Sequence, residues 1–453
     1  MNTKGSFTGE EIALAESCIG IAKKKGASKV RLTLNKSCMD LVGTLNGEVD
    51  KVTHCMDRSI SISLFVDGRF GSFSINRLEK EALEDFIGKA IETTRVLAED
   101  SCRDLPSPER TAKDAVTGLE LGLFDENYAR ITPEMRMETA LSASVFKEKT
   151  GNTSEGWKLV SEEGEYSDCS YDTLVLDSNG LRCRHTETSF DYGVEMTVED
   201  KDGNKFSGRW WHAHTFRDKL QTRECCEKAV ELAVKQIGPK RRRSGKYNMV
   251  IDSECASRVV TPLLNALSGY SIQQNNSFLR DSLGKRMFSE GLTIIDRCRS
   301  FGETGSRLFD SEGVATTEHS IIDNGCIKEY FLNTYISNKL EKAPTIEDAT
   351  RPKVMPWPEP GMDREKIMRK CRNGILVTGF NGGNSNSSTG DYSFGIEGFA
   401  FKDGKITHPV KEMLITGNLI DLWNNLTAAG DDARLCMSKL IPTLAFSNVD
   451  FSG

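Results

Sequence analysis

The sequence lacks the features that define several large classes of protein. No run approaches the ~18 apolar residues of a membrane span, and residues 1–25 contain three glutamates and no long apolar core, unlike a signal peptide. The thirteen cysteines are an odd number without a CxxC pair, which disfavours a disulfide framework or a cysteine zinc cluster. The formal net charge of -7 provides no positive field for nucleic acid. We expect a cytoplasmic protein with neither a nucleic-acid nor a membrane partner.

Signatures of two common catalytic classes are also missing. Neither Ser277 nor Ser393 stands in the G-x-S-x-G turn that exposes a serine nucleophile. The glycine-rich segment 379–390 lacks the GK[ST] ending of a phosphate-binding loop, so we expect no nucleotide site. Asp310 and Glu312 could form a carboxylate pair, but no other feature points to acid–base chemistry there. A turn-stabilising or structural role is the preferred interpretation of this pair.

The six histidines do not predict a metal site. His212 and His214 would share one face of a strand, but a catalytic zinc needs about three protein ligands and no third candidate stands near them. We therefore prefer a structural or surface role for this pair. The other four are isolated in the sequence and are not expected to bind metal: His54, His185, His319 and His408.

The length of 453 residues exceeds what one ordinary core supports. We predict an N-terminal domain over 1–115, a central domain over 116–240 and a C-terminal domain over 241–453. The first two share an order of helix, antiparallel sheet and helix, which suggests a duplication, although this order is common. The C-terminal part is rich in short strands separated by Gly and Asn turns. The predicted fold class is α+β, with a β-rich C-terminal domain.

Local patterns place several elements. Thr8 and Glu11 predict a capping box that begins a helix. Asn46-Gly47 lies between two strand-like segments and predicts a hairpin turn. Thr132 is expected to cap a helix that has Pro133 at its first position.

The start of the C-terminal domain combines a basic run and a helix. The run Lys240–Arg243 is interpreted as a solvated linker, with a nucleic-acid or partner patch as the alternative. Asp252 or Ser253 is expected to cap a helix that continues to Leu267, and Pro262 inside it should produce a kink.

Five segments follow one another along the chain: Val66-Asp67-Gly68-Arg69-Phe70-Gly71-Ser72, residues 277–285 (SFLRDSLGK), 309–313 (FDSEG), 325–335 and Thr389-Gly390-Asp391-Tyr392-Ser393. Together they resemble the TldD/PmbA family, which also carries the label of modulators of DNA gyrase. The second segment resembles an element typical of the PmbA, or TldE-like, branch.

The resemblance also indicates what the chain lacks. In the TldD branch a His-Glu-x-x-x-His motif on a helix binds zinc and supplies the catalytic carboxylate. The corresponding positions here are Asn265, Ala266 and Tyr270. An amide and a phenol are poor zinc ligands at neutral pH, and a methyl group cannot take a proton from water. We expect this helix to keep its shape, and we assign this chain no metal, no cofactor and no catalytic residue.

The resemblance implies a non-catalytic subunit of a cytoplasmic metallopeptidase complex that degrades peptides or unfolded proteins. Zinc is expected in a TldD-type partner, and a homodimer is possible when the partner is absent. Whether the chain has enzymatic activity on its own stays open. Two alternatives are a regulatory protein-binding factor of the DNA gyrase modulator type and a stand-alone homodimeric hydrolase.

The glycine and amide segment 379–390 has two interpretations. Its backbone N–H groups could line a peptide channel, or its glycines could serve a long turn with positive φ angles. The family places this loop near the cleft. The candidate peptide-binding positions are Ser277, Phe278, Asn381, Gly382, Gly383, Gly390 and Asp391.

Overall fold

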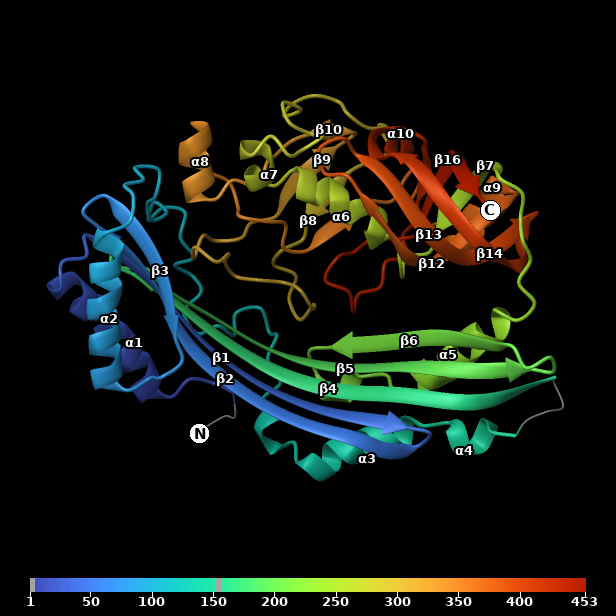
Figure 1. The fold of residues 1–453 in the computed structure, drawn as a ribbon, viewed down its shortest axis with the longest axis horizontal. Helices are drawn as coiled ribbons and strands as arrows, with labels where there is room; N and C mark the ends of the chain where they lie inside the picture. The colour runs from blue at the N-terminus through green and yellow to red at the C-terminus, as the bar shows by residue number, and fades with distance from the viewer. Residues whose placement is uncertain (1–4, 152–155) are drawn as a thin grey trace. The chain divides into compact units, whose positions relative to one another are not determined.

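A computed structural model describes residues 5–151 and 156–453 and confirms the α+β class (Figure 1). The chain divides into two compact units. The first comprises residues up to Val234 together with Arg299–Thr316, and the second comprises Lys235–Cys298 and Thr317–Gly453. The predicted domain boundaries at 115 and 240 and the duplication stay predictions. Within the described ranges, no helix is both long and apolar enough to cross a membrane.

The first unit is built on a six-stranded antiparallel sheet in the order β3-β2-β1-β4-β5-β6. Strand β1 pairs with β4 over fifteen positions, so residues of the predicted N-terminal domain and of the predicted central domain share this sheet. Positive φ angles at Asn46-Gly47 confirm the predicted hairpin turn, because such a turn requires left-handed backbone, and Asp67-Gly68 forms a second turn of this kind between β2 and β3. The strands are β1 (Lys29–Leu45), β2 (Glu48–Val66), β3 (Arg69–Ile75), β4 (Trp157–Asp177), β5 (Arg182–Asp200) and β6 (Lys205–His214).

Helices pack on this sheet because the strands alternate apolar and polar side chains. α1 (Gly9–Lys24) and α2 (Lys80–Arg95) lie beside the sheet (Figure 1). They form one core cluster with Val30, Leu32 and Leu34 of β1, which are fully buried. The predicted capping box of Thr8 and Glu11 is present, and Thr132 caps the helix that begins at Pro133. The other helical elements are η1 (Tyr128–Arg130), α3 (Pro133–Ala143), α4 (Phe146–Lys149), η2 (Arg217–Lys219) and α5 (Arg223–Lys235).

A segment from the C-terminal third of the sequence completes the core of the first unit. Leu308 and Phe309 are buried in one cluster with Val175, Leu181 and Cys183 of the sheet. The segment that carries them, Arg299–Thr316, contains no regular helix or strand.

The second unit contains a sheet that closes on itself. Its order is β14-β13-β12-β7-β16-β15, and an additional pairing of β14 with β16 completes a ring. β7 and β12 are parallel and the other neighbours are antiparallel. These strands are β7 (Gly245–Ile251), β12 (Gly374–Ser385), β13 (Asp391–Lys402), β14 (Lys405–Asn418), β15 (Leu426–Ala429) and β16 (Leu444–Ser452).

A smaller four-stranded sheet and short helices complete the second unit. The small sheet has the order β10-β9-β8-β11, with bounds Ile294–Asp296 (β8), His319–Asp323 (β9), Cys326–Ile327 (β10) and Pro352–Val354 (β11). The helices are α6 (Ser257–Ala266), α7 (Gly269–Gln273), α8 (Thr334–Leu340), α9 (Arg364–Cys371) and α10 (Leu419–Asn424).

The predicted cap of α6 is wrong. The residue that precedes the helix is Ala256, and no side chain caps the helix there. The Asp252 carboxylate instead accepts the Glu254 N–H and pairs with Arg364 at 2.5 Å. Its backbone carbonyl accepts from the N–H groups of Cys255 and Ala256, so a separate turn precedes the helix.

Candidate functional site

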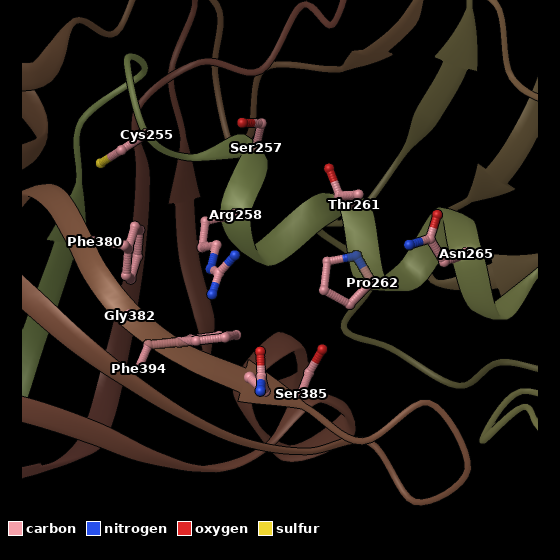
Figure 2. A pocket seen from close by; sticks show the side chains of 11 residues that line it. Cys255, Ser257, Arg258, Thr261, Pro262, Asn265, Phe380, Gly382, Ser385 and Phe394 are labelled. Atoms are coloured by element: carbon pink, nitrogen blue, oxygen red, sulfur yellow. The ribbon is translucent and has the colours of Figure 1, made fainter.

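A pocket of about 650 Å³ lies within the second unit between the α6 segment and strands β12 and β13 (Figure 2). Two of the sequence-predicted positions, Asn265 and Gly382, line it together. The complete lining is Cys255, Ser257, Arg258, Thr261, Pro262 and Asn265 from the α6 side, and Phe380, Gly382, Asn384, Ser385 and Phe394 from the strands.

α6 presents its pocket-lining side chains because one of its faces is apolar and buried and the opposite face is polar. Val259, Val260, Leu263 and Leu264 are buried and fix the helix against the core of the unit. The pocket residues of α6 recur at spacings of three and four, which places them along the opposite stripe. Its one charged side chain, Arg258, lies on that stripe. The helix therefore offers the pocket a polar face with a single positive charge.

The helix ends within one residue of the predicted Leu267, so the three motif positions do not lie on one continuous helix. α6 ends at Ala266, Ser268 has extended backbone (φ -61°, ψ 126°), and α7 begins at Gly269. The chain leaves the helix because its backbone pairs with a distant residue, Phe331. The Gly269 N–H donates to the Phe331 carbonyl at 2.8 Å, and the Phe331 N–H donates to the Leu267 carbonyl at 3.0 Å.

The three motif positions consequently have different surroundings. Asn265 is exposed and lines the pocket. Ala266 is buried in the core of the unit. Tyr270 lies on α7 with 59% of its surface exposed, and it is not among the residues that line the pocket.

The donor set at this position does not fit a zinc ion. A catalytic zinc takes about three ligands from His, Cys, Asp or Glu. The pocket lining contains neither a histidine nor a carboxylate, and its one thiol belongs to Cys255. Burial raises the pKa of that thiol well above its usual value, so the thiolate that a metal requires is disfavoured. We derive no chemical step through a metal in this pocket.

Ser277 joins the end of α6 to the segment that follows it. Its hydroxyl donates to the Ala266 carbonyl at 2.5 Å and accepts from the Leu279 N–H at 3.0 Å. The side chain is buried. These two backbone contacts give Ser277 an anchoring role at the helix end.

Phe278 and Gly390, two of the predicted peptide-binding positions, lie next to each other. The Phe278 N–H donates to the Ser387 carbonyl at 2.9 Å. Gly390 has φ +80°, and a Cβ there would lie 3.2 Å from the Phe278 ring. A side chain at position 390 would therefore be strained in its backbone and crowded by the ring.

Most of the predicted glycine loop is strand. β12 continues to Ser385 and pairs with β13, with a bulge between Phe380 and Gly383, so only residues 386–390 form the connection. Gly382 and Gly383 have φ angles of 125° and 85°. A Cβ at Gly383 would lie 1.9 Å from the Ser393 carbonyl oxygen, so only glycine fits this close strand approach.

The last two predicted positions have local partners. Asn381 directs its amide oxygen over Gly395, where an added Cβ would lie 2.1 Å away. The exposed Asp391 carboxylate accepts from the Asn418 amide at 2.9 Å and from the Thr389 hydroxyl at 2.7 Å. Both hydrogen bonds lower the pKa of Asp391, and the bond from Asn418 has the larger effect.

Arg258 is a pocket residue that the sequence patterns did not single out. Its guanidinium carbon lies 4.6 Å from the centre of the Phe394 ring, and one N–H group donates to the Gly383 carbonyl at 2.6 Å. Figure 2 shows the side chain pointing from α6 toward the strands that carry Phe380 and Phe394. Its signal in the sequence is that it is the one charged residue in SRVVTPLLNA.

Among the described residues, one group in the first unit has a possible metal-ligand arrangement: Cys38, Asp40 and His54. Asp40 and His54 are directly opposite on β1 and β2, with an Oδ1–Nδ1 distance of 2.8 Å, so His54 is not isolated in space. The other Asp40 oxygen lies 3.0 Å from the Arg136 guanidinium. Burial and the Asp40 charge raise the pKa of the Cys38 thiol. We assign no metal to this group.

The His212–His214 pair and the Asp310–Glu312 pair, both considered in the sequence analysis, make local contacts with the backbone. The rings of His212 and His214 stack at 6.5 Å, and their Nδ1 atoms accept backbone N–H groups of Gln221 and Phe216. Asp310 accepts from the N–H groups of Glu312 and Val314 within one turn.

Comparisons with known proteins agree along most of the chain. It matches PmbA/TldA metallopeptidase domain 1 over residues 34–94, the central domain over 129–237 and the C-terminal domain over 244–453. Metalloprotease PmbA of Escherichia coli O157:H7 is 27% identical over 416 residues, which span 89% of this chain and 88% of that protein.

Two solved structures share the fold. A proposed modulator of DNA gyrase from Bacteroides thetaiotaomicron has a TM-score of 0.91 and 37% identity, covering 98% of this chain and 99% of that chain. TldE from Thermococcus kodakarensis has a TM-score of 0.82 and 18% identity over 97% of this chain and 100% of that chain, a likeness that concerns the fold alone. With three domain matches in order over residues 34–453, the chain belongs to the PmbA/TldD metallopeptidase family.

Proposed function

We propose that this chain is the non-catalytic, PmbA/TldE-type subunit of a TldD/TldE-type peptidase complex. In this proposal a TldD-type partner holds the zinc and the catalytic carboxylate, and the complex acts on peptides or unfolded proteins in the cytoplasm. This chain contributes a peptide-holding surface and no reacting group of its own.

The observation that carries the proposal is the chemistry at the motif positions. Asn265, Ala266 and Tyr270 stand where the zinc-bearing relatives are expected to have two imidazoles and a carboxylate. The break at Ser268 puts the third position on a separate helix. The pocket beside Asn265 has the volume of a small-ligand site and neutral polar groups that suit peptide amides.

The proposal is tested by metal analysis and by reconstitution of peptidase activity. The full-length chain, purified in zinc-containing buffer, should hold far less than one zinc per chain by elemental mass spectrometry. It should not cleave a casein digest alone. Cleavage should begin when a TldD-type chain with an intact His-Glu-x-x-x-His motif is added, because that motif supplies the metal ligands and the base.

The matched control is the same TldD-type chain with its motif glutamate replaced by glutamine. Its mixture with this chain should stay inactive, since neither chain then supplies the base. Near-stoichiometric zinc in this chain by itself would overturn the proposal. Turnover by the isolated chain that survives strong chelation would favour a stand-alone hydrolase instead.

One observation favours a second candidate function. The Bacteroides relative, 37% identical, is described as a proposed modulator of DNA gyrase. A regulatory chain of that type would act through protein contacts, because the net charge of -7 disfavours duplex binding. Affinity purification from the source cells separates the two functions: a TldD-type chain as the dominant partner supports the first, and topoisomerase subunits support the second.

A further inference from the structure

The pocket beside α6 has an unbalanced set of charges. Of its eleven lining residues, Arg258 is the one cation and none is a carboxylate. The other polar groups are amides and hydroxyls, and the thiol of Cys255 has a raised pKa because it is buried. A pocket with this lining has an attractive potential for an anion.

The nearest carboxylates in the sequence do not neutralise Arg258. Asp252 pairs with Arg364 at 2.5 Å, and Glu254 pairs with Arg434. No described residue forms an ion pair with Arg258 itself, and one of its five N–H groups donates to a protein acceptor. The remaining N–H groups of this planar fork are available to a ligand.

The guanidinium is held in place before any ligand binds. It lies over the Phe394 ring, which in turn stacks on Tyr392 at 5.3 Å and meets Phe380 edge-on at 5.7 Å. The Gly383 carbonyl, which accepts the hydrogen bond from Arg258, lies at the bulge in β12. Stacking and one hydrogen bond reduce the rotamer freedom that binding would otherwise cost.

We propose that Arg258 binds the carboxylate of a peptide in this pocket. An arginine fork matches a carboxylate through two parallel hydrogen bonds, whereas an ammonium group offers a point charge. Asn265, Asn384 and Thr261 lie in the same lining and can hydrogen-bond neighbouring amides. About 650 Å³ accommodates more than a simple ion. The inference rests on the proposed peptide-holding function and specifies the group that the chain recognises.

The carboxylate could be the C-terminus of a peptide or an acidic side chain, and three probes distinguish them. These are Ala-Gly-Ala-Leu-Phe with a free C-terminus, the same peptide as a C-terminal amide, and the amide with its third residue changed to Asp. Binding to the full-length chain is measured by isothermal titration calorimetry. At least one acidic probe should bind more than about 10-fold tighter than the neutral amide, which is the effect of one charge-assisted contact.

Arg258→Gln should abolish this preference, and Arg258→Lys should recover part of it. The matched control is Arg242→Gln, which removes a guanidinium stacked on Tyr247 at the same 4.6 Å and should leave peptide affinity unchanged. Thr261→Glu provides a variant that keeps Arg258. Its carboxylate would stand three residues along the same helix and pair with the arginine. It should therefore lower the affinity for the acidic probe about as much as Arg258→Gln does.

Selective binding of the free acid identifies a C-terminal site, and selective binding of the Asp-containing amide identifies a side-chain site. Equal affinity of all three probes, undetectable binding of all three, or acidic-probe affinity that survives Arg258→Gln overturns the inference. These titrations use the chain alone and do not depend on metal or turnover. Zinc found in the isolated chain would therefore refute the subunit proposal without altering their result.

Discussion

Arg136 is a buried positive charge of the first unit. Its guanidinium makes two hydrogen bonds to Asp168, at 2.7 and 2.9 Å, and lies 3.0 Å from Asp40. The exposed fractions of the Arg136 and Asp168 side chains are 4% and 0%. The Tyr166 hydroxyl donates to the same carboxylate at 2.9 Å. A buried charge of this kind is tolerated because its partner is present.

Replacing Arg136 by Met should lower the free energy of unfolding of the first unit by ~3–5 kcal/mol, since Asp168 is left buried without its counter-charge. Urea denaturation followed by circular dichroism measures the loss. Arg130→Met, on the exposed surface nearby, should cost less than ~1 kcal/mol. The double variant Arg136→Met/Asp168→Leu should recover part of the loss. Equal costs for the two single variants would contradict this argument.

The interruption between α6 and α7 depends on the fit of one glycine. A Cβ at Gly269 would lie 2.6 Å from the Phe331 carbonyl oxygen and from Leu332, and 2.8 Å from Ile336. The carbonyl cannot move away cheaply, because it accepts the Gly269 N–H. The helix break and the close approach of residue 331 therefore require each other.

Gly269→Ala should destabilise the second unit by ~1–3 kcal/mol, the usual cost of an extra methyl group in a packed site. Thermal unfolding measures the shift. Gly20→Ala is the control, and we expect it to change the stability in the opposite direction. It lies exposed in α1, has nothing within 4 Å of an added Cβ, and should stabilise the chain by up to ~1 kcal/mol. A neutral Gly269→Ala would mean that the break does not need this contact.

Elements set by neighbouring residues were predictable from the sequence. The capping box of α1, the cap at Thr132 and the turn at Asn46-Gly47 each depend on side chains within four positions. The break at Ser268 and the bulge in β12 were not predictable, because the partners that cause them, Phe331 and Phe394, are distant in the sequence or across a strand pair.

The same distinction applies to the candidate site. Asn265 and Gly382 were identified from the sequence and line one pocket. Arg258 was missed, because its importance comes from a ring and a carbonyl on β12 and β13. The proximity of His54 to Asp40 likewise arises from cross-strand register, which periodicity alone does not give.

At the scale of the whole chain, sequence order and structural unit do not coincide. The polypeptide passes from the first unit to the second after Val234, returns for Arg299–Thr316, and then completes the second unit. Leu308 and Phe309 in the returning segment are buried with Val175 and Cys183. The stability of the first unit therefore depends on residues far beyond the boundary predicted at 240.

Phe309→Ala should consequently loosen the first unit, although position 309 lies in the C-terminal third of the sequence. Removing a buried aromatic side chain costs ~3–5 kcal/mol. Hydrogen exchange measured by mass spectrometry should show faster exchange in peptides covering 174–184. Phe446→Ala, which removes a ring packed on Trp423 in the second unit, should leave those peptides unchanged and increase exchange in 245–251, the strand paired with β16. If Phe446→Ala loosened 174–184 as much as Phe309→Ala did, the two units would unfold together, and the returning segment would not be a specific part of the first core.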